Sequence, residues 1–212
     1  MRKKILLPDE ENARLTVERF QEINGRLSGK KEEILRAISS HSRFLGNSII
    51  RNPRALTVLA NEKALRRKKT LSSHRAPLVS IVRNSQDSEQ FSERLKEYKY
   101  TELSRIIYRE VLGLCAFRQT MEEISDLAVS VVRAVLDFYR SRIEGGDEFE
   151  FVVLGMGKLG GRLLNLSSDI DLVYLYRSES YAEQIFTLSS SCLLYTSPSP
   201  RDRTRSRMPS SA

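Results

Sequence analysis

Apolar residues recur every three or four positions along most of the first 140 residues, a spacing typical of amphipathic helices. Asn52-Pro53 suits the start of one such helix, because Asn can cap free amides and Pro fits the first helical position. The pattern predicts short helices over residues 9–24, 30–39, 44–50 and from Asn52 onward. Gly25 and Gly29 separate the first two.

Two longer helices are predicted further along the chain. Residues 89–114 carry an apolar stripe formed by Leu95, Leu103, Ile107, Val111 and Leu114. Thr120 and Glu123 have capping-box spacing, so the second helix is expected to begin at Thr120 and to end at Gly145-Gly146. Because their connection is short, the two helices should pack antiparallel and support the segment that follows.

The polar stretch 66–88 is interrupted by Pro77 and is predicted to be a loop, with at most a helical turn or a strand over 78–82. On this interpretation His74 is an exposed loop residue and His41 a turn residue. Neither histidine has a sequence neighbour that would make it a catalytic base.

The pattern changes at Phe149, where an apolar run rich in β-branched and aromatic residues indicates a buried strand that ends at Gly155. A glycine-rich turn follows, with room for about two helical turns. A second strand then opens with Asp169 and Asp171 and continues as the apolar run 172–176. We therefore predict an α+β fold, mostly α, with a helical region over 1–145 and the start of an αβ domain over 146–190.

The aspartates and the glycine turn together suggest chemistry. Residues i and i+2 of an extended strand point to the same face, so Asp169 and Asp171 should aim two carboxylates at one point. Glycines let the backbone approach a ligand without Cβ clashes. The combination predicts a site for Mg²⁺ carrying the phosphates of a nucleotide. Lys158, within the turn, could neutralise phosphate charge.

This stretch also fits two other interpretations. Gly155, Gly157 and Gly160 match the G-x-G-x-x-G fingerprint of dinucleotide-binding folds. That fold needs its acidic residue at the far end of the second strand and a longer crossover helix, and neither is present. The other alternative is a purely structural role of the glycines. It does not explain the two aspartates, because burying unpaired carboxylates at the start of an apolar strand costs free energy.

The string G-M-G-K-L-G-x-R-x-L-N-x-S-S-D-I-D-L, from Gly155 to Leu172, is similar to the signature of the polymerase-β-like nucleotidyltransferases. In its full length it resembles the bifunctional glutamine-synthetase adenylyltransferase/adenylyl-removing enzymes. Leu163 stands where that family usually has Glu, and Leu166 where Phe is common. The segment 101–113 also resembles a family stretch, which makes Arg105 and Arg109 candidate contacts to phosphate or to the catalytic domain, with surface ion pairs as the alternative.

The resemblance implies a truncated nucleotidyltransferase domain that removes AMP from a tyrosine of glutamine synthetase by phosphorolysis, giving ADP. A second domain of the family attaches AMP from ATP, and PII signal-transduction proteins and glutamine govern both activities. Asp169 and Asp171 would be the catalytic and Mg²⁺-binding residues. Ser167 or Ser168 could bond phosphate or cap the strand entry, and the second role is favoured. The residues expected to contact nucleotide or phosphate are Gly155, Gly157, Lys158, Gly160, Gly161 and Ser168.

The superfamily pattern also needs a third carboxylate on a later strand, and no acid after Asp171 has a convincing strand around it. The chain alone is therefore expected to be inactive. Two alternatives stay open, a non-catalytic helical docking or regulatory module with a vestigial site and a stand-alone nucleotidyltransferase with another acceptor.

The amino-acid composition further restricts the class of protein. The chain has 212 residues, 40% hydrophobic and 29% charged, which is typical of a globular protein. It has no apolar run of about 20 residues and no signal peptide, so a cytoplasmic location without a membrane anchor is expected. Cys115 and Cys192 are too few for a disulfide framework, and Cys115 is predicted to be a small core residue.

The net charge of +8 comes from 35 basic and 27 acidic residues. Residues 191–212 hold four arginines and one aspartate and so contribute +3 of it. The densest basic run, 66–69, lacks interleaved aromatic residues and is predicted to be a solvated helix end, so nucleic acid is not expected as a partner. Residues 191–212 are rich in Ser, Arg and Pro, resemble translated adapter sequence, and are expected to be a non-native, disordered tail.

Overall fold

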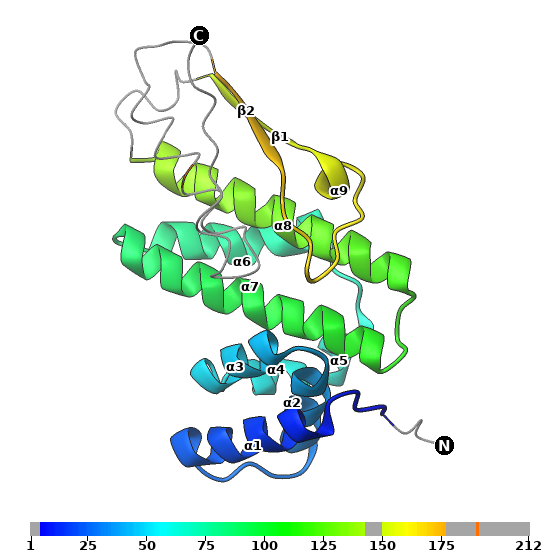
Figure 1. Ribbon diagram of the computed structural model, residues 1–212. Coiled ribbons are helices and arrows are strands. Elements are labelled where there is room, and N and C mark those ends of the chain that lie inside the picture. Colours follow the sequence, from blue (N-terminus) through cyan, green and yellow to red (C-terminus); the bar gives the residue numbers. More distant parts are fainter. Residues whose placement is uncertain (1–4, 143–149, 177–189, 191–212) are drawn as a thin grey trace.

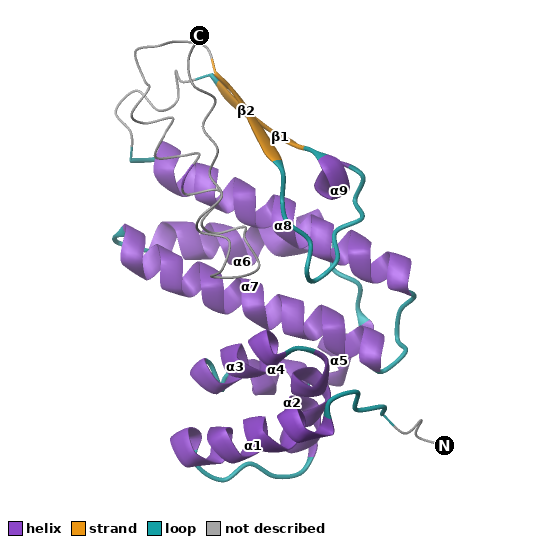
Figure 2. Cartoon of the chain, viewed as in Figure 1, coloured by secondary structure: helices purple, strands orange, loops and turns teal. Residues whose placement is uncertain are grey.

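The computed structural model describes residues 5–142, 150–176 and 190 (Figure 1). Helices dominate, and one strand pair follows them, so the predicted α+β class, mostly α, is confirmed (Figure 2). The helices are α1 Glu10–Asn24, α2 Lys30–His41, α3 Arg43–Arg51, α4 Ala55–Leu59, α5 Glu62–Arg66, α6 Leu71–Asn84, α7 Ser88–Val111, α8 Phe117–Arg140 and α9 Gly157–Gly160. The strands are β1 Phe151–Gly155 and β2 Leu172–Tyr176.

The elements are stacked in layers along the molecule (Figure 1). Helices α2, α3 and α4 pack against one side of α7, and α1 packs on α2 and α3. Helices α6, α7 and α8 contact one another, with α7 and α8 antiparallel as predicted. The strand pair rests on α8, where the buried Phe151 packs against Leu136 and Tyr139. Helix α8 therefore connects the helical region to the segment that carries the aspartates.

The predicted helices over 9–24, 30–39, 44–50 and 89–114 correspond to α1, α2, α3 and α7. The start at Asn52-Pro53 is shifted, because these residues form a turn and α4 begins at Ala55. Helix α8 begins at Phe117 rather than at Thr120, so the predicted capping box is wrong. The amide of Ala116 instead donates to the Gln119 side chain, and Glu123 lies in the protein interior. The predicted end at Gly145-Gly146 lies outside the described residues.

The predicted loop over 66–88 is wrong, because most of it forms helix α6. Pro77 lies inside this helix. Proline removes one backbone hydrogen bond, but packing of α6 against α7 and α8, which buries Leu78, maintains the helical conformation. His74 also lies in α6 and is fully buried, not exposed as predicted, whereas His41 ends α2. Tertiary packing has overridden the local signal here.

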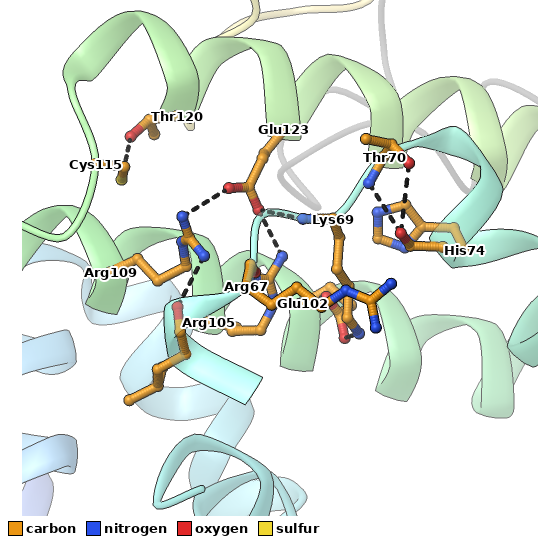
Figure 3. A network of polar contacts seen from close by, with 12 residues as sticks. Arg67, Lys69, Thr70, His74, Glu102, Arg105, Arg109, Cys115, Thr120 and Glu123 are labelled. Atoms are coloured by element: carbon orange, nitrogen blue, oxygen red, sulfur yellow. Dashed lines mark hydrogen bonds and ion pairs between the residues drawn. The ribbon is translucent and has the colours of Figure 1, made fainter. Parts of the chain in front are cut away.

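A buried ion network joins α7, α8 and the connection between α5 and α6 (Figure 3). The guanidinium of Arg105 donates to Glu102 Oε2 at 2.8 Å and to Glu123 Oε2 at 2.7 Å. Arg109 donates to the carbonyl of Leu65 at 2.7 Å and lies 3.3 Å from Glu123 Oε1. Arg105 and Glu123 are fully buried, so the alternative of surface ion pairs is wrong in its placement. Within the described chain, these arginines form their hydrogen bonds and ion pairs with residues of the helical region.

The basic run 66–69 contributes to this network and is not simply solvated. Arg66 ends α5, but Lys69 pairs with Glu102, and Lys68 pairs with Glu122 at 2.7 Å. Burial alone would raise the pKa of the Glu102 carboxyl, but Arg105 and Lys69 beside it hold that pKa below its usual value. The run therefore ties the start of α6 to both long helices.

His74 gives the fold a dependence on pH. Its ring is fully buried, Nδ1 lies 2.7 Å from the Tyr98 hydroxyl, and Nε2 has no partner within the described chain. Burial lowers the pKa of His74 from 6.5 to about 4, with Glu102 opposing the shift and Lys69 and Arg105 adding to it. Between these values the unfolded chain binds a proton that the folded chain does not, so acid favours unfolding.

We expect the free energy of unfolding to fall by about 2 kcal/mol between pH 7 and pH 5 through His74 alone. His74→Gln should remove most of this slope, because glutamine does not titrate. Urea unfolding followed by circular dichroism at several pH values measures it. His41→Gln, the same change at the exposed histidine, should keep the wild-type slope, and equal slopes in wild type and His74→Gln would contradict the assignment.

Candidate functional site

Strands β1 and β2 form an antiparallel pair, in register from Phe151 opposite Tyr176 to Gly155 opposite Leu172. Helix α9 between them has a single turn, shorter than the two turns predicted. A dinucleotide-binding unit needs a crossover between parallel strands, so the antiparallel pairing excludes that interpretation for this segment. The alternation of burial along both strands leaves one face toward the helices and the other exposed.

Asp169 and Asp171 lie in extended chain directly before β2, rather than inside the strand as predicted. Both are exposed, whereas Ile170 between them and Leu172 after them pack against the core. The alternation directs both aspartates to the solvent side. The amide of Met156 donates to the carbonyl of Asp171 at 2.8 Å, which extends the strand pairing by one bond and fixes Asp171 beside the glycine turn.

Gly157 lets the Asp171 carboxylate lie against the backbone of the turn. Its φ is +53°, and a Cβ added there would lie 2.9 Å from Asp171 Oδ2. Gly160 allows a close approach of backbone to backbone, because a Cβ there would lie 2.6 Å from the carbonyl oxygen of Gly155. Only glycine fits both positions without displacing a neighbouring atom. The glycine turn and the Asp171 carboxylate are therefore in direct contact.

The other predicted site residues differ in their surroundings. Lys158 is exposed in α9 and makes no ion pair within the described chain. Gly161 is exposed at the end of α9, near the half-exposed side chain of Leu163. Ser168 is buried, and its hydroxyl donates to Asn165 Oδ1 at 2.9 Å and accepts from the Asn165 amide at 3.1 Å. This geometry favours the capping role of Ser168 over a contact with phosphate.

Sequence reasoning missed the residues of α8 that hold this loop. Arg162 donates to Asp126 Oδ1 at 2.7 Å, and the amide of Leu164 donates to the Ser125 hydroxyl at 3.2 Å. Asp126 and Ser125 are buried although both are polar. The available signal was that Ser125 and Asp126 are polar residues next to apolar positions of a predicted helix. The sequence did not indicate which residues would bond to them.

A divalent cation at these two aspartates would have to lie on their solvent side, where both are exposed. The carboxylates of Asp169 and Asp171 have no ion pair or hydrogen bond within the described chain, and oxygen ligands of this kind suit Mg²⁺. Among residues 5–142, 150–176 and 190, no group of three or more His, Cys, Asp or Glu side chains could hold a metal ion. The donor set therefore fits Mg²⁺ but supplies only two carboxylates.

The inner side of the loop is closed to a nucleotide. The pocket between the loop and helices α7 and α8 has a volume of about 30 Å³ and is lined by Leu164, Ile170 and Lys99, among others. Small-molecule sites usually need about 300 Å³ or more. A nucleotide would have to lie on the exposed side, where the glycine turn and the carboxylates meet.

The amino-acid sequence that forms this site matches a family of known proteins. The family model of glutamate-ammonia ligase adenylyltransferase matches residues 32–188, which is most of the chain and includes the whole strand–turn–strand segment. The chain belongs to this family. The adenylyltransferase family assignment agrees with the resemblance carried by the glycine string and the two aspartates.

Three relatives share the name bifunctional glutamine synthetase adenylyltransferase/adenylyl-removing enzyme. The protein from Shewanella loihica is 27% identical over 75% of this chain, and that from Thioalkalivibrio sulfidiphilus is 30% identical over 72%. The protein from Pseudomonas aeruginosa is 30% identical over 68% of this chain. The aligned part is 17%, 17% and 16% of these relatives, so this adenylyltransferase-family chain spans about a sixth of their length.

Among the described residues, no helix is both long enough and apolar enough to cross a membrane. The predicted non-native tail and Cys192 lie outside the described residues. Cys115, predicted as a core residue, is only partly buried in the connection between α7 and α8, with Sγ 3.6 Å from the hydroxyl of Thr120.

Proposed function

We propose that residues 150–176 carry the nucleotide- and Mg²⁺-binding part of an adenylyl-removing site that acts on glutamine synthetase. The observation that carries the proposal is the contact between Gly157 and the Asp171 carboxylate, which lies against the backbone of the glycine turn because Gly157 has no side chain. Asp169, two residues earlier, is exposed as well. Membership of the adenylyltransferase family and the names of the relatives support the reaction and its protein substrate.

In this reaction an oxygen of inorganic phosphate attacks the phosphorus of AMP on the modified tyrosine. The bond from phosphorus to the tyrosine oxygen breaks, the tyrosine regains its proton, and ADP leaves. A bound Mg²⁺ would supply charge neutralisation at the reacting phosphate oxygens. Asp169 and Asp171 would hold this ion, the glycine turn would admit the phosphates, and Lys158 would neutralise a non-bridging oxygen.

We propose glutamine synthetase as the protein partner and PII proteins as regulators. We further propose ATP, ADP and phosphate as the small-molecule ligands and the cytoplasm as the location. Because the described site offers only two carboxylates, the chain by itself is expected to show no measurable adenylyl transfer and little removal. Release of ADP from adenylylated glutamine synthetase by this chain, dependent on Asp169, would contradict that expectation.

Mn²⁺ binding tests the site without requiring turnover, since Mn²⁺ uses the same oxygen ligands as Mg²⁺. We expect Asp171→Asn to raise the Mn²⁺ dissociation constant by about tenfold or more, because one charged ligand is lost. Paramagnetic resonance of free Mn²⁺ in a titration measures this. Asp137→Asn, which removes one exposed carboxylate on α8, is the matched control and should bind as the wild type does. Equal affinities in all three proteins would exclude the proposed site.

A second function, docking without catalysis, is favoured by one observation. Leu163 stands where the family resemblance expects glutamate, and its side chain is 44% exposed beside the glycine turn. An apolar group at this place weakens a polar site. If the chain docks only, binding to glutamine synthetase or to a PII protein should survive the double change Asp169→Ala and Asp171→Ala, and the Mn²⁺ titration should show no site.

A further inference from the structure

We propose that Asp126 and Ser125 of α8 are positioning residues that set the direction of Asp169 and Asp171. This inference rests on the proposed function, because it concerns the same metal site. Its basis is that the loop from Arg162 to Asp171 is attached to α8 at its beginning and to Met156, directly after β1, at its end. Between these points the loop packs against the core.

The first attachment is the ion pair of Arg162 with Asp126. Arg162 has φ +56°, the left-handed region that a residue with a Cβ rarely adopts. Its guanidinium donates to Asp126 Oδ1 at 2.7 Å, and Asp126 is buried within α8. A buried carboxylate is costly without a partner, so Asp126 favours the conformation that brings Arg162 to it. The ion pair thereby stabilises the strained turn that ends the glycine segment.

The second attachment lies two residues further along. The Leu164 amide donates to the Ser125 hydroxyl at 3.2 Å, and the Leu164 side chain is 1% exposed within the core. Asn165 and Ser168 then form a hydrogen-bonded turn, and Ile170 packs against the core. The Asn165–Ser168 turn and the packing of Ile170 fix the chain directly before Asp169 and Asp171.

The last attachment is the backbone hydrogen bond from Met156 to Asp171. Because the backbone is held on both sides of the aspartates, their Cα–Cβ bonds keep a fixed direction relative to the glycine turn. A metal site gains affinity when groups outside the ligand set fix its ligands in the binding geometry. Removing the contacts to α8 should therefore weaken metal binding although none of these residues touches the ion.

Mn²⁺ titration of the full chain tests this proposal. Arg162→Ala and Ser125→Ala should each raise the Mn²⁺ dissociation constant, with an effect of about tenfold for Arg162→Ala. Arg162→Lys keeps a donor that can reach Asp126 and should restore most of the affinity. Arg118→Ala, which removes an exposed arginine that pairs with Glu122 on the same helix, is the matched control and should bind as the wild type does.

Amide hydrogen exchange completes the test. The amides of residues 162–171 should exchange faster in Arg162→Ala than in the wild type, because this loop loses its ion pair with Asp126. If Asp171→Asn weakens Mn²⁺ binding but Arg162→Ala and Ser125→Ala do not, the positioning role is overturned and the metal site stands. If Asp171→Asn has no effect, the proposed function itself fails. A failure of Arg162→Lys to restore affinity would also count against the ion pair.

Discussion

Replacing Glu123 by alanine is expected to lower the free energy of unfolding by about 3 to 5 kcal/mol. Glu123 is fully buried and pairs with Arg105 at 2.7 Å and with Arg109 at 3.3 Å. Without it both guanidinium groups stay in the interior, with Glu102 the only remaining acid in that network within the described chain. Uncompensated buried charge is among the most destabilising changes a protein can undergo. Since domains are stable by about 5 to 15 kcal/mol, the variant should be close to unfolding at 25 °C.

Urea denaturation followed by far-ultraviolet circular dichroism measures this loss. Glu122→Ala is the matched control, because Glu122 is the next residue on α8 but pairs with Lys68 and Arg118 at the surface. Exposed pairs contribute about 0 to 1 kcal/mol, so this variant should remain stable. Equal losses in the two variants would show that the burial of Glu123 does not have the effect argued here. Glu123→Gln, which keeps the shape and one acceptor, should fall between wild type and Glu123→Ala.

Phe138→Ala is expected to cost about 3 to 5 kcal/mol through the cavity that it leaves. The Phe138 ring is fully buried and stacks on Phe91 of α7, with ring centroids 3.9 Å apart. It also contacts Tyr139 edge to face, and the guanidinium of Arg142 lies 3.6 Å from its centroid. Because these contacts join α7 to the end of α8, the loss should extend to the support of β1.

The matched control is Phe117→Ala, the same substitution at the 59% exposed first residue of α8. It removes little buried area and should change the free energy of unfolding by about 0.5 kcal/mol or less. Thermal and urea unfolding of both variants give the comparison. A Phe138→Ala variant as stable as Phe117→Ala would mean that the ring stack is not a principal contact of the core.

The sequence predicted the long helices because apolar residues recur along them at helical spacing. It also predicted the strand–turn–strand segment, because an apolar run, a glycine turn and a second apolar run are local patterns. It failed at α6, where Pro77 and polar residues indicated a loop. The free energy that favours the helix there comes from contacts with α7 and α8, which no local pattern contains.

The positions of the buried charged residues also depend on contacts between distant segments, which the sequence did not reveal. Arg105 and Arg109 lie off the apolar stripe of α7, and sequence reasoning therefore placed them at the surface or at phosphate. They are buried because Glu123 of α8 and the chain at 65–69 surround them, and those partners are distant in sequence. For Arg162 too, the glycine string indicated a turn but gave no reason to expect an ion pair with Asp126.

By itself the sequence determined which residues form helices and strands over most of the chain, the two aspartates beside a glycine turn, and the family. These properties follow from periodicity and from short motifs, in which every interacting residue lies within a few positions. Only the tertiary structure decided that α8 both contributes Glu123 to the buried ion network and holds the candidate site through Ser125 and Asp126. That arrangement depends on which helix faces become neighbours, and the free energy of that choice comes from burial between distant segments.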